Sequence, residues 1–155
     1  MGGTSGVDRD GTDGVELGVL GDLIGFHLRM AQHVSFRAFQ RHTGVANLRP
    51  GWFAVLTLIE NNPGITPVML SRASGRDKST LTPVLRDLSR EKLVRREPIP
   101  NDRRSYGLHL TEAGRETLAH LDVCAAAHDR ELDAIVGDAK PLLLELLRRI
   151  ETELE

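Results

Sequence analysis

The sequence predicts a mainly α-helical fold that carries one small β-hairpin. Over most of the chain, apolar residues recur at intervals of three and four, the period of a helix with one buried face. Residues 94–110 differ, because two short strand-like segments flank the turn-forming sequence Pro-Asn-Asp at 100–102. With 155 residues, 40% of them apolar, the chain is long enough to bury the core of one ordinary domain.

Local start and stop signals place the individual elements. Thr66, Asp77 and Thr111 are suitable helix N-caps, prolines stand in several expected first turns, and Gly44, Gly75 and Gly137 are suitable stops. We therefore expect helices at residues 15–42, 49–60, 66–74, 77–90, 111–136 and from 138 onward, with strands at Val94–Ile99 and Ser105–Leu110.

These elements divide the chain into four parts. Residues 1–14 hold five glycines and no apolar cluster, so we expect a flexible tail. Residues 15–47 are expected to form an N-terminal dimerisation helix, 48–112 a compact lobe, and 113–155 the C-terminal dimerisation helices. The helices at both ends carry more apolar surface than one neighbour covers, which predicts an interface with a second subunit.

Charge is distributed unevenly along the chain. The stretch Leu70–Arg104 has ten Lys and Arg against five Asp and Glu, whereas the rest of the chain has ten against seventeen. The net charge is −2, yet a basic centre between acidic arms is typical of a protein with a negatively charged partner.

The basic centre has the pattern of a DNA-reading helix-turn-helix. In the segment 77–90, Leu81, Leu85 and Leu88 share one helical face, and hydroxyl and guanidinium side chains lie opposite. A helical hairpin with a solvated charged face is the simpler alternative for these two helices alone. The β-hairpin that follows favours DNA, because a basic wing tip can enter a narrow minor groove. The expected fold is therefore a winged helix-turn-helix with dimerisation helices at both ends.

Other classes of function lack their motifs. The single Cys124 excludes an intramolecular disulfide, and we expect it to be buried. The six histidines show no compact ligand spacing, and His120 and His128 are too far apart on one helix to chelate an ion, so no metal is expected. No catalytic or cofactor-binding motif is present, which argues against an enzyme. The absence of a signal peptide and of an apolar run of about 18 residues predicts a cytoplasmic protein.

Several motifs, in their order and spacing, resemble the multiple antibiotic resistance regulator (MarR) family. They are Arg49-Pro50-Gly51, Asn62-Pro63-Gly64-Ile65-Thr66, Asp77-Lys78-Ser79-Thr80-Leu81-Thr82, Leu93-Val94-Arg95-Arg96, Asp102-Arg103-Arg104 and Leu110-Thr111-Glu112-Ala113-Gly114-Arg115. The resemblance covers about Leu17 to the C-terminus. It implies a homodimer in which the terminal helices intertwine and two winged helix-turn-helix lobes bind a pseudo-palindromic DNA operator.

The resemblance also implies which residues contact DNA. Ser79, Thr80, Thr82 and Arg86 would face the major groove, Ser71 and Arg72 would approach phosphate, and Arg104 would enter the minor groove, oriented by Asp102 and assisted by Arg103. Lys78, Pro83 and Arg90 complete the expected set. Many relatives have a basic residue where this chain has Pro83, so base preference is not carried over. We expect Pro83 to bend the helix slightly or to contact a thymine methyl group.

Regulators that resemble this chain typically release DNA when a small phenolic or other aromatic ligand binds between the dimer helices and the reading lobe. Some respond to acyl-CoA thioesters or to oxidation. The expected pocket residues are Phe26, Met30, His33, Arg37, Trp52 and Phe53, with Arg37 or His33 pairing with an anionic group. These aromatic residues are alternatively ordinary core. Further alternatives are redox control through Cys124, constitutive DNA binding without a ligand, and a module whose basic face binds an acidic protein.

Overall fold

The structure is a computed structural model that describes residues 14–44, 48–100 and 102–154, and of residues 102–104 the backbone alone. The chain divides into two compact units, Met1–Ser35 and Phe36–Glu155. The flexible tail predicted at residues 1–14 therefore lies, except for Gly14, outside the described residues.

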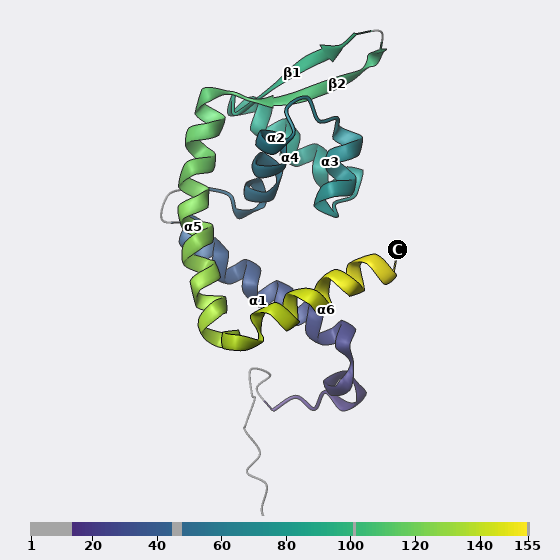
Figure 1. Ribbon diagram of the computed structural model, residues 1–155, viewed down its shortest axis with the longest axis vertical. Helices are drawn as coiled ribbons and strands as arrows, with labels where there is room; N and C mark the ends of the chain where they lie inside the picture. The colour runs from purple at the N-terminus through teal and green to yellow at the C-terminus, as the bar shows by residue number, and fades with distance from the viewer. Residues whose placement is uncertain (1–13, 45–47, 101, 155) are drawn as a thin grey trace, which may run out of the picture. The chain divides into compact units, whose positions relative to one another are not determined.

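The first unit contains a short 3-10 helix, η1 (Gly18–Asp22), and the beginning of α1 (Ile24–Gly44; Figure 1). The prediction of one continuous helix from residue 15 is wrong at its start, because Leu23 is extended (ψ 119°) and separates η1 from α1. Gly18, the first residue of η1, has a φ of +54°, a left-handed conformation that glycine adopts without strain and that does not continue an α-helix.

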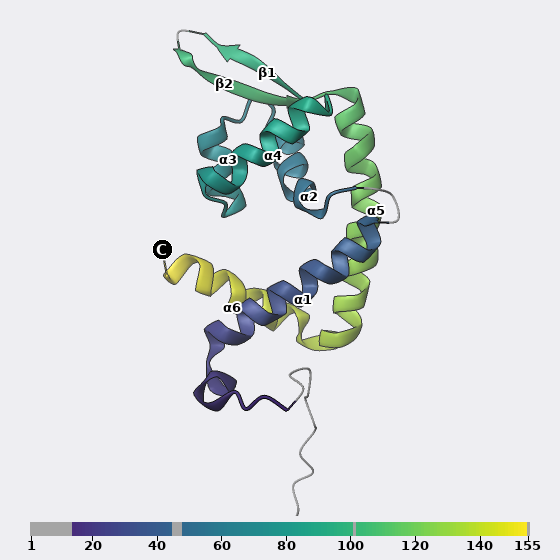
Figure 2. The same ribbon diagram turned by 180° about the vertical axis from the view of Figure 1, so that it is seen from behind.

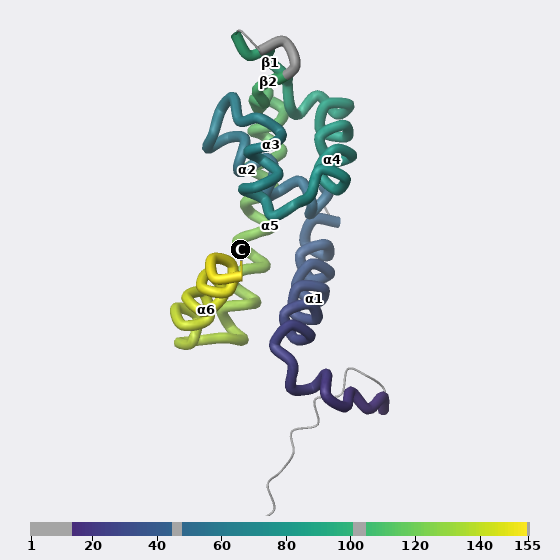
Figure 3. Tube along the Cα trace, turned by 90° about the vertical axis from the view of Figure 1, so that its right-hand side faces the viewer, coloured from purple at the N-terminus to yellow at the C-terminus, as the bar shows by residue number. Residues whose placement is uncertain are grey.

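The winged lobe belongs to the second unit and follows the predicted order. It consists of η2 (Pro50–Trp52), α2 (Phe53–Asn61), α3 (Pro67–Ser74), α4 (Lys78–Arg90), β1 (Val94–Ile99) and β2 (Asp102–Leu110). Figures 1 and 3 show α2, α3 and α4 gathered beneath the antiparallel hairpin of β1 and β2.

One face of each element forms the core of this lobe. Leu81, Leu85 and Leu88 of α4 are buried, as the sequence predicts. They belong to one cluster with Trp52, Val55, Leu56, Ile59, Ile65, Leu70, Leu93, Val94, Leu108, Leu110, Leu118 and Leu121. Burial of a leucine or isoleucine side chain contributes about 1.5–3 kcal/mol, so this cluster fixes how the helices and the hairpin are oriented within the lobe.

The loop before α3 is attached to the hairpin by backbone bonds. Ile65 forms an isolated bridge with Leu108, and the amide of Gly64 donates to the Leu108 carbonyl oxygen at 2.9 Å. A Cβ atom on Gly107 would lie 2.9 Å from the Gly64 carbonyl oxygen. Glycine at 107 therefore allows the loop to approach β2 closely enough for these bonds.

The last turn of α4 is a Schellman motif. The Leu93 amide donates to the Leu88 carbonyl oxygen at 2.9 Å, and the Lys92 amide donates to that of Ser89 at 3.1 Å. Lys92 has the left-handed conformation that this motif requires, with a φ of +58°. Leu88 and Leu93 are both buried in the core, and the motif directs the chain from α4 into β1.

The first turn of α5 is joined to this motif. The Thr111 amide donates to the Leu93 carbonyl oxygen at 3.0 Å, and the Thr111 hydroxyl donates to that of Lys92 at 2.7 Å. The hydroxyl oxygen also accepts the Gly114 amide at 3.0 Å, which makes Thr111 the N-cap of α5. A Cβ atom on Gly114 would lie 2.1 Å from the Leu93 carbonyl oxygen, far inside the contact limit.

Beyond the lobe, α5 (Glu112–Val136) leads through η3 (Gly137–Ala139) into α6 (Lys140–Glu153; Figure 2). Lys140 Nζ binds Asp129 Oδ2 at 2.9 Å and Asp133 Oδ1 at 2.5 Å. The bond to Asp133, and to a lesser extent the bond to Asp129, raise the pKa of Lys140. Both bonds hold the start of α6 against α5. No described helix combines the length and the apolar character needed to cross a bilayer.

We predict that Gly114→Ala destabilises the protein by at least about 2 kcal/mol, because the added methyl group forces α5 away from the Leu93 carbonyl oxygen. Gly25→Ala is the matched control, since a Cβ there meets nothing within 4 Å and alanine favours a helix. Urea unfolding of both variants measures the effect, and equal midpoints would contradict the prediction.

Candidate nucleic-acid interface

Local capping bonds fix the ends of α3 and α4. The Thr66 hydroxyl oxygen accepts the Met69 amide at 3.3 Å and caps α3. Gly75 ends α3 in the left-handed conformation, with a φ of +62°. Asp77 then caps α4, so the turn between the two helices consists of residues 75–77.

Asp77 organises the first turn of α4. Its Oδ1 accepts the Ser79 hydroxyl at 2.6 Å, the Thr80 amide at 2.8 Å and the Thr80 hydroxyl at 2.9 Å. These bonds lower the pKa of Asp77 to about 2, and the bond from the Ser79 hydroxyl contributes most to this shift. The carboxylate is therefore ionised at neutral pH, and it accepts hydrogen bonds from the first turn of its own helix.

The hydroxyl groups of α4 present acceptors to a partner. Ser79 and Thr80 donate to Asp77, and the Thr82 hydroxyl donates to the Lys78 carbonyl oxygen at 2.7 Å. Because each hydroxyl has one proton, its lone pairs remain for external donors. In the major groove such donors are the exocyclic amines of adenine and cytosine.

The predicted DNA-binding residues of the two helices lie at the surface. Ser71 is half-buried, and the exposed ones are Arg72, Lys78, Ser79, Thr80, Thr82, Pro83, Arg86 and Arg90. Pro83 has no amide to donate to the Ser79 carbonyl oxygen, yet α4 continues without interruption from Lys78 to Arg90.

The cations of α4 differ in their availability. Asp87 forms ion pairs with Arg49 and, at 3.3 Å, with Arg90, which also binds Glu91 at 3.3 Å. Within the described part of the chain, Lys78 and Arg86 form no ion pair. These two are therefore the cations of α4 best able to meet a negatively charged partner.

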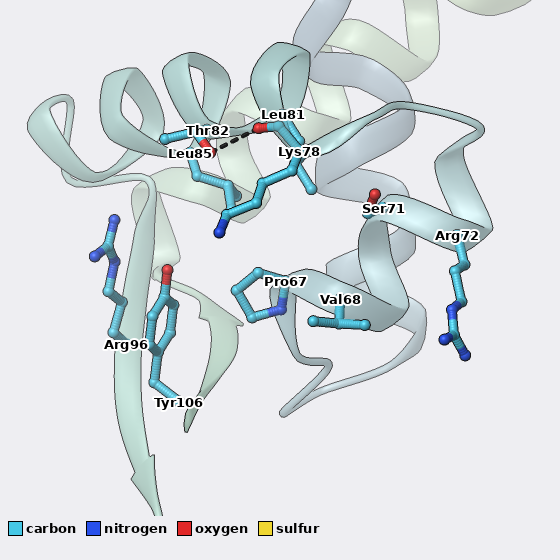
Figure 4. Close-up of a pocket in the computed structure, with 10 residues that line it drawn as sticks. All are labelled: Pro67, Val68, Ser71, Arg72, Lys78, Leu81, Thr82, Leu85, Arg96 and Tyr106. Atoms are coloured by element: carbon cyan, nitrogen blue, oxygen red, sulfur yellow. Dashed lines mark hydrogen bonds between the residues drawn. The ribbon is translucent and has the colours of Figure 1, made fainter. Parts of the chain in front are cut away.

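A hollow of about 340 Å³ opens between α3, α4 and the hairpin (Figure 4). Its lining residues are Pro67, Val68, Ser71, Arg72, Lys78, Leu81, Thr82, Leu85, Arg96 and Tyr106. In Figure 4 the Lys78 side chain extends from α4 over the hollow, whereas Arg72 points away from it. Cationic groups and hydroxyls around an apolar floor suit an anionic group such as a phosphate.

Arg96 and Tyr106 were not among the predicted DNA-binding residues. The Arg96 guanidinium lies 4.7 Å from the Tyr106 ring centroid, a cation–π contact that holds both side chains beside the hollow. Arg96 pairs with Leu108, so Tyr106 is its diagonal neighbour on the same face of the hairpin. The strand register, which the sequence alone does not give, brings them together.

The predicted wing-tip residues begin β2. Asp102 pairs with Ile99 after a register shift next to Pro98. The side chains of Asp102, Arg103 and Arg104 lie outside the described part of the structure, so their roles stay predictions.

A second cavity, of about 450 Å³, lies between the last turns of α1, the start of α2 and the middle of α5. Its lining residues are Phe39, Phe53, Ala125, Ala126, His128 and Asp129. Phe39 stacks on His128 with ring centroids 5.7 Å apart and meets Phe53 edge-on at 5.8 Å. The cavity therefore has aromatic walls and polar groups at one side.

The predicted ligand residues are not gathered at this cavity. Phe53 lines it, whereas Trp52 is 8% exposed in the lobe's core, beneath the Arg49 guanidinium. Arg37 is exposed. In the first unit, Phe26 and Met30 are half-buried and His33 is exposed. The sequence did not point to Phe39 or His128 as pocket residues, because the pairing of α1 with α5 has no local signature.

Cys124 is half-buried, not fully buried as predicted. Its thiol donates to the His42 carbonyl oxygen at 3.6 Å. This contact joins α5 to the last turn of α1.

Comparisons with known proteins agree with this architecture. The MarR family model matches residues 48–106. A protein of Thauera aromatica, named as a transcriptional regulator for the hcr operon, is 36% identical over 129 residues, which cover 82% of this chain and 78% of that protein.

Two structures of the transcriptional repressor CouR are also similar. CouR bound to a 23-mer DNA duplex has a TM-score of 0.80 and 32% identity, covering 88% of this chain and 98% of CouR. CouR bound to p-coumaroyl-CoA has a TM-score of 0.81 and 30% identity, and the match covers 90% of this chain and 99% of CouR. The winged lobe and these relatives lead to one assignment: the chain belongs to the MarR family and is a DNA-binding transcriptional repressor of that type.

Proposed function

We propose that this protein is a homodimeric repressor that binds a pseudo-palindromic operator and leaves it when a small aromatic effector binds. The observation that carries this proposal is the exposed face of α4 next to the basic hollow. One surface thus offers groups that can read bases and groups that can bind the DNA backbone. In such a dimer the two half-sites lie about one helical turn, or 34 Å, apart.

The first half of α4 is the proposed reading element in the major groove. Ser79, Thr80 and Thr82 offer acceptor oxygens there, and Arg86 offers a guanidinium suited to guanine. Pro83, exposed on the same helix, is suited to the methyl group of a thymine. Arg90 is paired with two carboxylates and is therefore less available than Arg86 for a DNA contact.

The hollow is the proposed site of a DNA phosphate. Lys78 lies over it, Arg96 and Tyr106 line its hairpin side, and Ser71 lines its α3 side. Beyond it, the wing tip is proposed to place Arg104, oriented by Asp102 and assisted by Arg103, in the minor groove. Arg72 is proposed to contact a separate phosphate, because it points away from the hollow.

Exposed apolar side chains support a dimer. On α6, Leu142, Leu143 and Leu146 are between 41% and 58% exposed, and in the first unit Val19, Leu23 and Ile24 are between 46% and 72% exposed. Burial of such surface against a second subunit gains about 25 cal/mol per Å². Exposed apolar surface on the helices of each unit is typical of an interface.

The cavity between α1, α2 and α5 is the proposed effector site. Phe39 and Phe53 offer aromatic walls, and Ala125 and Ala126 leave room for a planar ring. His128 and Asp129 offer polar contacts to a hydroxyl group on that ring. The likeness to CouR bound to p-coumaroyl-CoA supports a phenolic acid or its CoA thioester.

Selection from a random-sequence DNA pool with the full-length protein tests the DNA-binding proposal. We expect enrichment of an inverted repeat whose half-site centres are about 10–11 base pairs apart. A pool that shows no motif after repeated rounds would overturn the proposal and favour a basic face that binds an acidic protein. A motif with one half-site would contradict the dimer.

We predict that Arg96→Ala weakens binding to the selected operator several-fold. The plot of log affinity against log salt concentration should become less steep by about one unit, as for the loss of one phosphate contact. Arg95→Ala is the matched control, because Arg95 directly precedes Arg96, lies on the opposite face of β1 and is paired with Glu97. Gel shifts at three salt concentrations measure both. Equal losses in the two variants would refute the hollow as a phosphate site.

Filling the effector cavity should block the response without affecting DNA binding. We predict that Ala125→Leu keeps operator affinity but abolishes release by those phenolic acids or CoA thioesters that release the wild type. Ala134→Leu, at an exposed position on the same helix, should respond normally. A normal response in Ala125→Leu would place the effector elsewhere. Release by hydrogen peroxide in the wild type that is absent in Cys124→Ser would favour redox control.

A further inference from the structure

Three potential metal ligands meet where the last turn of α1 packs on α5. We propose that His42, His128 and Glu131 bind one divalent transition-metal ion, and that zinc fits them best. The site lies apart from α3, α4 and the wing. It does not depend on the identity of the effector.

The three side chains converge from two helices of the second unit. His128 and Glu131 are three residues apart on α5 and therefore project from the same face. His42 reaches them from the last turn of α1, with Nε2 3.0 Å from Glu131 Oε1. One ligand atom from each of the three residues lies within 4.8 Å of the other two.

These distances suit a metal ion after small side-chain rotations. Zinc binds imidazole nitrogen and carboxylate oxygen at about 2.0–2.2 Å, which places neighbouring ligand atoms of a tetrahedral site about 3.4 Å apart. The observed separations, from 3.0 Å to at most 4.8 Å, bracket this value.

The ligand chemistry selects the class of ion. Two imidazoles and one carboxylate form a set that zinc uses where a fourth position stays open for water or another ligand. Magnesium and calcium prefer oxygen ligands throughout. A simple ion pair needs His42 and Glu131 alone. His128, whose ring centroid is 6.2 Å from that of His42, completes a set of three donors.

The surroundings hold the ligands and leave a path for the ion. Phe39 stacks on His128 and limits rotation of its ring. The Cys124 thiol bonds to the His42 carbonyl oxygen and fixes the last turn of α1. The side chains of His42 and Glu131 are 26% and 50% exposed, so an ion can enter from solvent.

The metal would act on the same region as the effector. His128 is both a proposed ligand and a lining residue of the second cavity. A bound ion fixes the His128 ring and joins the end of α1 to α5. By linkage, the ion and any ligand of that cavity change each other's affinity by the same factor.

Titration of the full-length, tag-free, chelator-treated protein with ZnCl₂ in a calorimeter tests the proposal. We expect one equivalent per chain with micromolar or tighter affinity, and an intense tetrahedral visible spectrum when CoCl₂ replaces zinc. His42→Ala, His128→Ala and Glu131→Gln should each lower the affinity at least tenfold. Absence of saturable binding in the wild type would overturn the proposal.

Two controls separate the site from other causes. Glu131 is half-exposed, so Glu131→Gln should fold like the wild type, as its metal-free melting temperature will show. His120→Ala removes an exposed histidine from the same helix and should leave zinc binding unchanged. Unchanged affinity in Glu131→Gln, or an equal loss in His120→Ala, would refute this ligand set.

Discussion

The lobe depends on one crowded contact, at which the backbone oxygen of Leu93 meets the first turn of α5. The Leu93 amide completes the Schellman motif of α4, whereas its carbonyl oxygen accepts the Thr111 amide and lies 2.1 Å from the position that a Cβ atom on Gly114 would take. The helix α4, both strands of the hairpin and the long helix α5 are therefore connected at one joint. A change in the direction of α5 has to be accommodated at this joint, which would give the proposed effector a physical route to the proposed DNA-binding face.

The proposed DNA-binding face presents cations because the carboxylates of α4 and its cap are bonded to neighbouring groups of the lobe. Asp77 accepts three bonds from the first turn of α4, and Asp87 is paired with Arg49 and Arg90. Apart from Pro83, the remaining exposed groups of α4 are cations and acceptor hydroxyls, beside a hollow lined by the hairpin. This local arrangement explains how a chain with a net charge of −2 can present a positive surface at its proposed DNA-binding face.

The proposed effector cavity and the proposed metal site share one residue in the second half of α5. One side of His128 faces an aromatic cavity, and the same residue stands within reach of His42 and Glu131. The contacts of this region are few and join two helices that are separated along the chain by the whole lobe. Such a place is suited to regulation, because binding there changes how two elements are held together without altering the core beneath α4.

The sequence by itself determined the elements and their caps. Thr66, Asp77 and Thr111 act as N-caps as predicted, Gly75 and Gly137 end helices, and the leucine face of α4 is buried, because these signals act within a few residues of the chain. The start of α1 was missed, since Gly18 and the extended Leu23 interrupt an apolar period that is otherwise regular. The pairing of Arg96 with Tyr106, the second cavity and the meeting of His42 with Glu131 were decided by the tertiary structure alone. Each of these features combines residues from separate elements. The periodicity of a sequence indicates which face of an element is apolar, but not which faces pack together.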